Sequence, residues 1–119
     1  VTEFRWDGNL RHRKELSPDK THFWCSATLY PPAMQALREQ VFRRWLAQPK
    51  DKRRLPSGIL KLHLSGTVGD PENDFVMNRG DRVCTVSVTQ VVCQEKNIRM
   101  QYFDLLEGYR DLRRMQLFS

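Results

Sequence analysis

The segment 33–47 constrains the fold most, because it predicts a helix whose start is set by proline. Pro31 and Pro32 precede it, and proline is tolerated in the first turn of a helix but not in its interior. No glycine or proline interrupts the segment. The apolar residues that recur with helical spacing are Met34, Leu37, Val41 and Trp45. A helix with one apolar face is therefore predicted here.

Three other segments alternate between apolar and polar residues, which is typical of strands. They are 21–30, 59–68 and 83–92, and the last is rich in β-branched residues. A further strand is predicted at 97–103. From residue 104 the apolar spacing changes to a helical one, so a second helix is predicted at 104–115.

Together these elements predict an α+β fold with one helix at 33–47 and one at 104–115. We expect the strands to form a small antiparallel β-barrel or curved sheet. A split β-α-β (ferredoxin-like) sandwich is the alternative, because the order of the elements also fits that topology. The length of 119 residues suits one domain, which we place at 21–119 behind an N-terminal arm, 1–20.

The charge is positive and unevenly distributed. The net charge is +6, and residues 1–58 hold 12 Lys and Arg against 6 Asp and Glu. Arginine outnumbers lysine 14 to 6, and arginine binds phosphate through two parallel hydrogen bonds. This balance favours a polyanionic partner, namely single-stranded nucleic acid or RNA. A merely soluble basic surface is the alternative.

Single-stranded nucleic acid is bound by cations together with aromatic rings on which bases stack. The candidate cations lie in the arm, in the basic loop 48–58 and in later segments. They are Arg11, Arg13, Lys50, Lys52, Arg53, Arg54, Lys61, Arg79 and Arg82. The candidate rings are Trp24 and Tyr30, on the outward face of the predicted strand 21–30, and Phe75 in the long turn 69–82. Core packing is the alternative for each ring.

Residues 59–89 combine a glycine-containing strand end, a turn and a β-branched strand in a fixed order. The residues that carry this pattern are Gly66, Val68, Gly69, Asp70, Pro71, Glu72, Gly80, Val83, Ser87 and Val88. The pattern resembles the single-stranded-DNA-binding protein family of bacteria and mitochondria. Val86 departs from it, because the family has phenylalanine at that position.

The resemblance implies an OB-fold that binds single-stranded nucleic acid. In the family the barrel starts near the N-terminus, whereas here 58 residues precede the motif. Too few residues follow the motif to form the remaining strands. The implied barrel is therefore incomplete, rearranged or completed by a partner, so we expect protein partners or a homo-oligomer.

Motifs for catalysis are missing from the sequence. It contains neither a GxxxxGK phosphate loop nor an HExxH metal motif, and its three cysteines lack zinc-ligand spacing. We therefore expect no enzyme activity, no cofactor and no metal. No apolar run approaches the roughly 20 residues of a membrane-spanning helix, so no membrane partner is expected.

A second functional class fits the same residues. The chain is also interpreted as a structural subunit of a large ribonucleoprotein, such as a mitochondrial ribosome, that works mainly through protein contacts. Its first residue is Val, which indicates a processed or partial chain. Together with the basic charge and the resemblance, this predicts a mitochondrial, or otherwise intracellular, nucleoprotein component.

Overall fold

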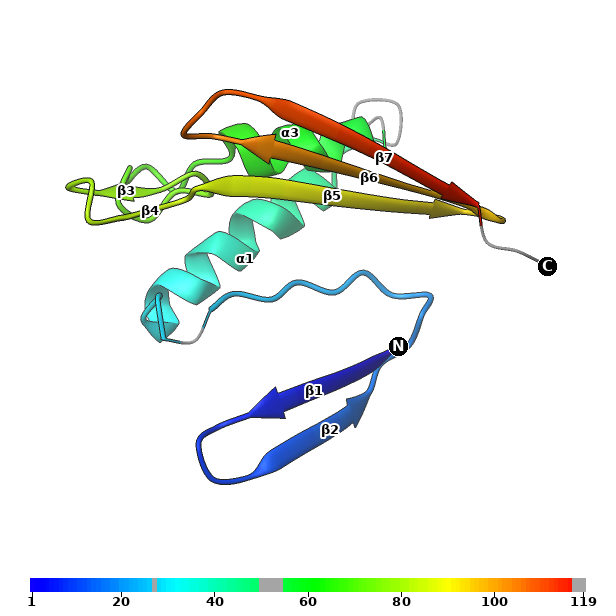
Figure 1. The fold of residues 1–119 in the computed structure, drawn as a ribbon. Coiled ribbons are helices and arrows are strands. Elements are labelled where there is room, and N and C mark those ends of the chain that lie inside the picture. The colour runs from blue at the N-terminus through cyan, green and yellow to red at the C-terminus, as the bar shows by residue number, and fades with distance from the viewer. Residues whose placement is uncertain (27, 50–54, 117–119) are drawn as a thin grey trace.

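A computed structural model describes residues 1–26, 28–49 and 55–116. The described residues form an α+β arrangement of helices and antiparallel strands (Figure 1). In chain order the elements are β1 (Thr2–Trp6), β2 (Arg11–Glu15), α1 (Pro32–Leu46), α3 (Ser57–Ser65), β3 (Asn78–Arg79), β4 (Val83–Cys84), β5 (Ser87–Gln94), β6 (Asn97–Asp104) and β7 (Arg110–Gln116).

Helix α1 confirms the helix predicted at 33–47. Pro32 occupies its first turn, and the carbonyl oxygen of Pro31 accepts hydrogen bonds from the backbone N–H groups of Met34 and Gln35. The proline therefore starts the helix without removing a bond that the helix needs. Arg43 and Arg44 lie in the last turn, where cations interact favourably with the helix dipole.

The core is small and is built around α1. Phe42 of α1, Leu62 of α3 and Phe75 form its buried centre. Phe23 stacks on Phe42 with 4.9 Å between the ring centroids. Because α1 and α3 each bring one buried apolar side chain to this centre, the contact between the two helices depends on few residues.

The strand predicted at 59–68 is wrong, because Ser57–Ser65 is the helix α3. The leucines of this segment alternate, but Ile59, Leu62 and His63 also share one helical face, and leucine favours helix over strand. The helix ends where the backbone N–H of Gly66 donates to Leu62 O. A Cβ atom at Gly66 would lie 2.5 Å from that oxygen, so only glycine fits this close approach.

The helix predicted at 104–115 is also wrong, because Arg110–Gln116 is the strand β7. One carboxylate oxygen of Asp104 accepts hydrogen bonds from the backbone N–H groups of Leu106 and Glu107. These bonds lower the pKa of Asp104, the Glu107 bond contributing most. Gly108 has φ +72°, a left-handed conformation that a helix does not contain. The segment therefore forms a hairpin loop between β6 and β7.

The other three strand predictions differ in their outcome. The strand predicted at 97–103 is confirmed as β6, and the one at 83–92 is confirmed in part, since it is divided between β4 and β5. The strand predicted at 21–30 is wrong, because none of its described residues belongs to a strand. This segment runs as an irregular chain between β2 and α1 (Figure 1). Its alternation reflects side chains such as Phe23 that pack against α1.

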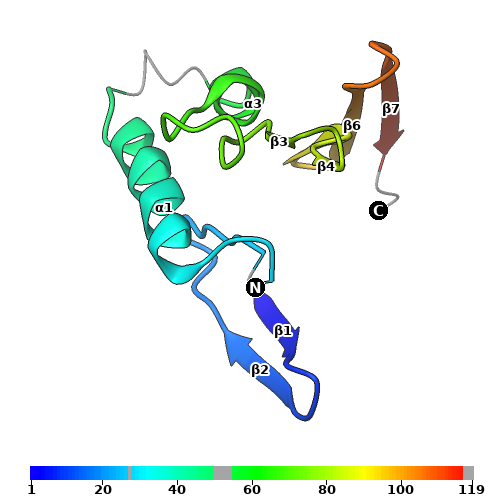
Figure 2. The ribbon, with the colours of Figure 1, turned by 90° about the vertical axis from the view of Figure 1, so that its left-hand side faces the viewer.

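The strands of the described residues form three small sheets, none of which is closed into a barrel. Strands β5, β6 and β7 form the largest sheet, and α3 lies against it, where Gln90 Nε2 donates to Pro56 O. The β1–β2 hairpin lies below α1 in both views and is separated from this sheet (Figures 1 and 2). The radius of gyration is 16.1 Å, above the roughly 13–14 Å of a compact chain of this length.

No helix among the described residues is long and apolar enough to cross a membrane.

Candidate nucleic-acid interface

The turn of the β1–β2 hairpin is held by Asp7. Its Oδ1 accepts hydrogen bonds from the backbone N–H groups of Asn9 and Leu10 at 2.9 and 2.8 Å. Its Oδ2 contacts His12 Nε2. Gly8 adopts φ +102° between these residues. The tight turn fixes the register of the strands, so that Phe4 lies opposite Arg13 and Trp6 opposite Arg11.

One face of the hairpin combines aromatic rings with arginines. Alternate residues of a strand point to the same face, so Phe4, Trp6, Arg11 and Arg13 lie on one face, together with Thr2 and Glu15. We call this the aromatic–arginine face. Phe4 is 74% exposed and Trp6 is 62% exposed. The guanidinium carbon of Arg13 lies 6.0 Å from the Phe4 ring centroid. Among the described residues Arg11 forms no ion pair, whereas Arg13 pairs with Glu15 at 2.8 Å.

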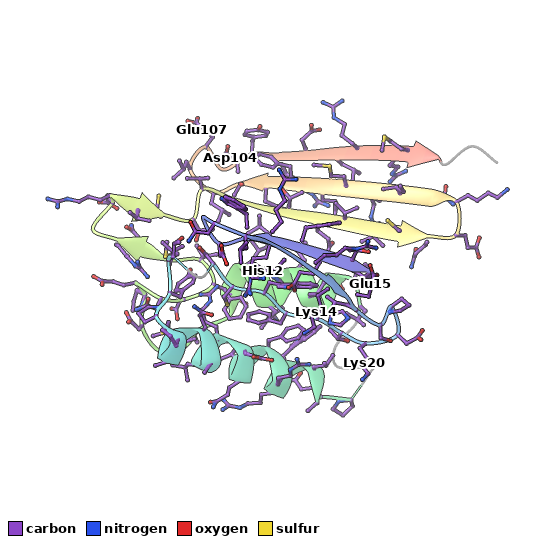
Figure 3. The ribbon with its side chains drawn as sticks, turned by 90° about the horizontal axis from the view of Figure 1, so that it is seen from below. His12, Lys14, Glu15, Lys20, Asp104 and Glu107 are labelled. Atoms are coloured by element: carbon purple, nitrogen blue, oxygen red, sulfur yellow. The ribbon has the colours of Figure 1, made fainter. Side chains whose placement is uncertain are left out.

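The opposite face of the hairpin is turned toward the chain that follows it. Glu3 lies on this face, and its carboxylate accepts a hydrogen bond from Trp24 Nε1. Trp24 is 57% exposed, and its ring lies 5.6 Å from that of His22. Figure 3 shows His12, Lys14 and Glu15 along the hairpin, which lies in front when the molecule is seen from below. Trp24 is thus the predicted ring that the structure brings closest to the hairpin.

Two predicted rings lie in the interior instead of on a binding surface. Tyr30 is 6% exposed and Phe75 is 7% exposed, so the exposure that base stacking requires is absent at both. The Arg38 guanidinium lies between them, 4.3 Å from the Tyr30 centroid and 4.5 Å from the Phe75 centroid. Its Nη1 donates to the carbonyl oxygens of Asn73 and Asp74. These rings and Arg38 join the long turn to α1.

The predicted cations are scattered over the molecule. Arg79 is occupied by internal contacts, since it donates to Glu72 O, Leu29 O and Asn73 Oδ1. Lys61 is exposed on α3, and Arg82 is exposed in the turn between β3 and β4. Four more lie outside the described residues: Lys50, Lys52, Arg53 and Arg54. Only Arg11 and Arg13 of the predicted cations lie together on one described surface with exposed rings.

Phe4 and Trp6 were not among the predicted rings, although the sequence carries a signal for them. Thr2, Phe4 and Trp6 alternate with Glu3 and Arg5 immediately before Asp7-Gly8-Asn9. An Asp-Gly pair that follows an alternating segment is typical of a hairpin. The same pattern places every second residue on one face, so it also indicates that both rings share a face.

The Asp7 turn predicts a pH dependence of the hairpin. The backbone N–H of Leu10, the His12 side chain and the backbone N–H of Asn9 lower the pKa of Asp7 from 3.8 to about 2. Because the unfolded hairpin binds this proton more tightly, the contribution of Asp7 is complete above pH 4 and is lost as the pH falls from about 4 to about 2. We expect the Asn9 and Leu10 amide resonances to shift toward disordered values in that interval. In Asp7→Ala the shift should be absent, and a titration unchanged by that substitution would contradict the assignment.

Comparisons of this chain with protein-family models, with curated proteins and with solved structures gave no match. The function proposed for this chain therefore rests on the residues of the β1–β2 hairpin and of the large β5–β6–β7 sheet.

Proposed function

We propose that this chain binds single-stranded nucleic acid, RNA or DNA, through the aromatic–arginine face of the β1–β2 hairpin, and that it does so without catalysis. The observation that carries the proposal is the exposure of Phe4 and Trp6 directly opposite Arg13 and Arg11. Bases stack on exposed rings, and guanidinium groups bind the phosphates beside them. A net charge of +6 supports a polyanionic ligand.

The exposed rings favour a single strand over a duplex. In a duplex the faces of the bases are covered by their neighbours in the stack, so a side-chain ring cannot reach them without unstacking. In a single strand they are accessible, and stacking tolerates any sequence because every base has such a face. We therefore expect weak sequence preference. The mitochondrial location stays a prediction.

The test is a fluorescence-anisotropy titration of a labelled single-stranded oligonucleotide with the whole chain at several salt concentrations. Binding should weaken steeply with salt, because each neutralised phosphate of a single strand contributes a slope of about −0.7 in log K against log salt. Arg11→Gln with Arg13→Gln should reduce the slope by about 1.4. Arg44→Gln, an exposed arginine of α1, serves as the control. An unchanged slope in the double variant, or equal affinity for duplex, would refute the proposal.

The large sheet supports a second candidate, a subunit of a larger assembly. Val91 lies opposite Met100, and Ile98 lies opposite Met115, all on the face that Arg99 and Gln101 do not occupy. Val91, Met100 and Met115 are 56%, 43% and 62% exposed. Contiguous exposed apolar side chains mark protein interfaces. A chain that elutes as a folded monomer at high concentration, without binding a hydrophobic dye, would favour the first candidate alone.

A further inference from the structure

Two arginines face each other on the large sheet. Arg99 of β6 pairs directly with Arg114 of β7, so their side chains start from the same face of the sheet at neighbouring positions. Like charges in such a pair repel each other. Among the described residues no carboxylate forms an ion pair with either arginine, while the adjacent Arg113 pairs with Asp111 at 2.9 Å. The pair is therefore not neutralised by the described part of the protein.

Arg99 also has a buried nitrogen that lacks a partner. Its Nε is buried and forms no hydrogen bond with the described residues. Arg38 has an unpartnered Nε as well, but its Nη1 donates to two carbonyl oxygens. Within the described part of the chain Arg99 has no such bond. A buried donor without an acceptor is costly, which makes Arg99 a candidate for binding an acceptor from outside the chain.

The two arginines line a hollow that can hold such an acceptor. Its volume is about 510 Å³, and the amide side chains of Gln94 and Asn97 lie at its wall. The described residues that line the hollow belong to β5, β6 and β7 and not to α3. They lie at the end of the sheet that extends beyond α3 (Figure 1). Amide and guanidinium N–H groups are donors, and two guanidinium groups together match the several oxygens of one oxyanion.

We propose that Arg99 and Arg114 form a phosphate-binding site, in which one phosphate group accepts hydrogen bonds from both guanidinium groups and removes their repulsion. The site is separate from the hairpin and does not depend on the function proposed for it. Its phosphate comes either from a nucleic-acid backbone or from a free phosphate compound, because both present the same oxygens. The second arm of the experiment below distinguishes the two sources.

The first arm of the test titrates the whole chain with inorganic phosphate, at constant ionic strength set with chloride, while the arginine Nε–H resonances are recorded by NMR. We expect a saturable shift of the Arg99 resonance. The apparent affinity should fall at least tenfold in Arg114→Gln, which replaces an exposed side chain and should leave the fold intact. Arg110→Gln, at the other end of β7, is the matched control and should bind phosphate as the unchanged protein does.

The second arm replaces phosphate by a single-stranded oligonucleotide and by its uncharged methylphosphonate analogue. If the site takes a nucleic-acid backbone, the charged oligonucleotide shifts Arg99 at concentrations at least tenfold below those of inorganic phosphate, and the analogue does not. If it takes a free phosphate compound, inorganic phosphate is as effective as the oligonucleotide. An Arg99 resonance that responds to none of these probes, or responds equally in Arg114→Gln, overturns the proposal. Arg11→Gln with Arg13→Gln should leave the inorganic-phosphate shift unchanged, which separates this site from the hairpin.

Discussion

Replacement of both Phe4 and Trp6 by alanine is expected to weaken the binding of single-stranded nucleic acid about 30-fold or more. Base stacking on one aromatic side chain contributes roughly 1–3 kcal/mol, and a factor of ten in affinity corresponds to about 1.4 kcal/mol. Even the lower value for each ring therefore gives a loss of this size. The measurement is the dissociation constant for a single-stranded oligonucleotide at fixed low salt.

The control is Leu10→Ala, because Leu10 is also apolar, 64% exposed and part of the same hairpin. It should leave affinity within about twofold, since it removes no ring. Both rings are exposed, so the double substitution should not change the urea midpoint of unfolding. A loss of affinity equal to that of Leu10→Ala would show that the rings do not contact bases.

Arg38→Met is expected to destabilise the protein strongly. Arg38 is 8% exposed, and its Nη1 donates to Asn73 O and Asp74 O, each at 2.7 Å. Methionine keeps much of the apolar volume between Tyr30 and Phe75 but leaves both carbonyl oxygens without this donor. We expect the free energy of unfolding to fall by about 2–4 kcal/mol. Each unpaired buried acceptor costs roughly 1–3 kcal/mol, and the lower part of that range applies because Asn73 and Asp74 are half-buried.

Urea unfolding followed by circular dichroism measures this loss. Arg44→Met is the matched control, because Arg44 lies on the same helix and is exposed. It should change the unfolding free energy by less than about 0.5 kcal/mol. Similar unfolding curves for the two variants would mean that Arg38 does not hold the long turn against α1.

The elements that could be predicted from sequence are those with one unambiguous period. Helix α1 has a start signal at Pro32 and fifteen residues of helical spacing, while β5 and β6 are rich in residues that favour strands. The segment 57–65 could not be assigned in this way, because its leucines fit both periods. In 104–116 the local bonds of Asp104 and the left-handed Gly108 decided the fold, and an apolar count does not detect them.

Only part of the candidate site could be predicted from the sequence. Arg11 and Arg13 could be found by charge alone. Phe4 and Trp6 required the hairpin register, which a charge count does not provide. Tyr30 and Phe75 are of the residue types on which bases stack, but in the structure their rings enclose Arg38 in the interior. Whether an arginine and a ring bind a ligand or each other is decided by contacts between segments far apart in the chain.

The separation of the hairpin from the core has a consequence for the way this chain can change. The backbone bonds between Val1 and Leu16 close the hairpin on itself, and none of its residues belongs to the buried centre around Phe42. Substitutions on its outward face therefore leave the packing of α1 and α3 untouched. Ligand preference and folding can therefore vary independently on the outward face, whereas the opposite face stays tied to the following chain by the bond between Trp24 and Glu3.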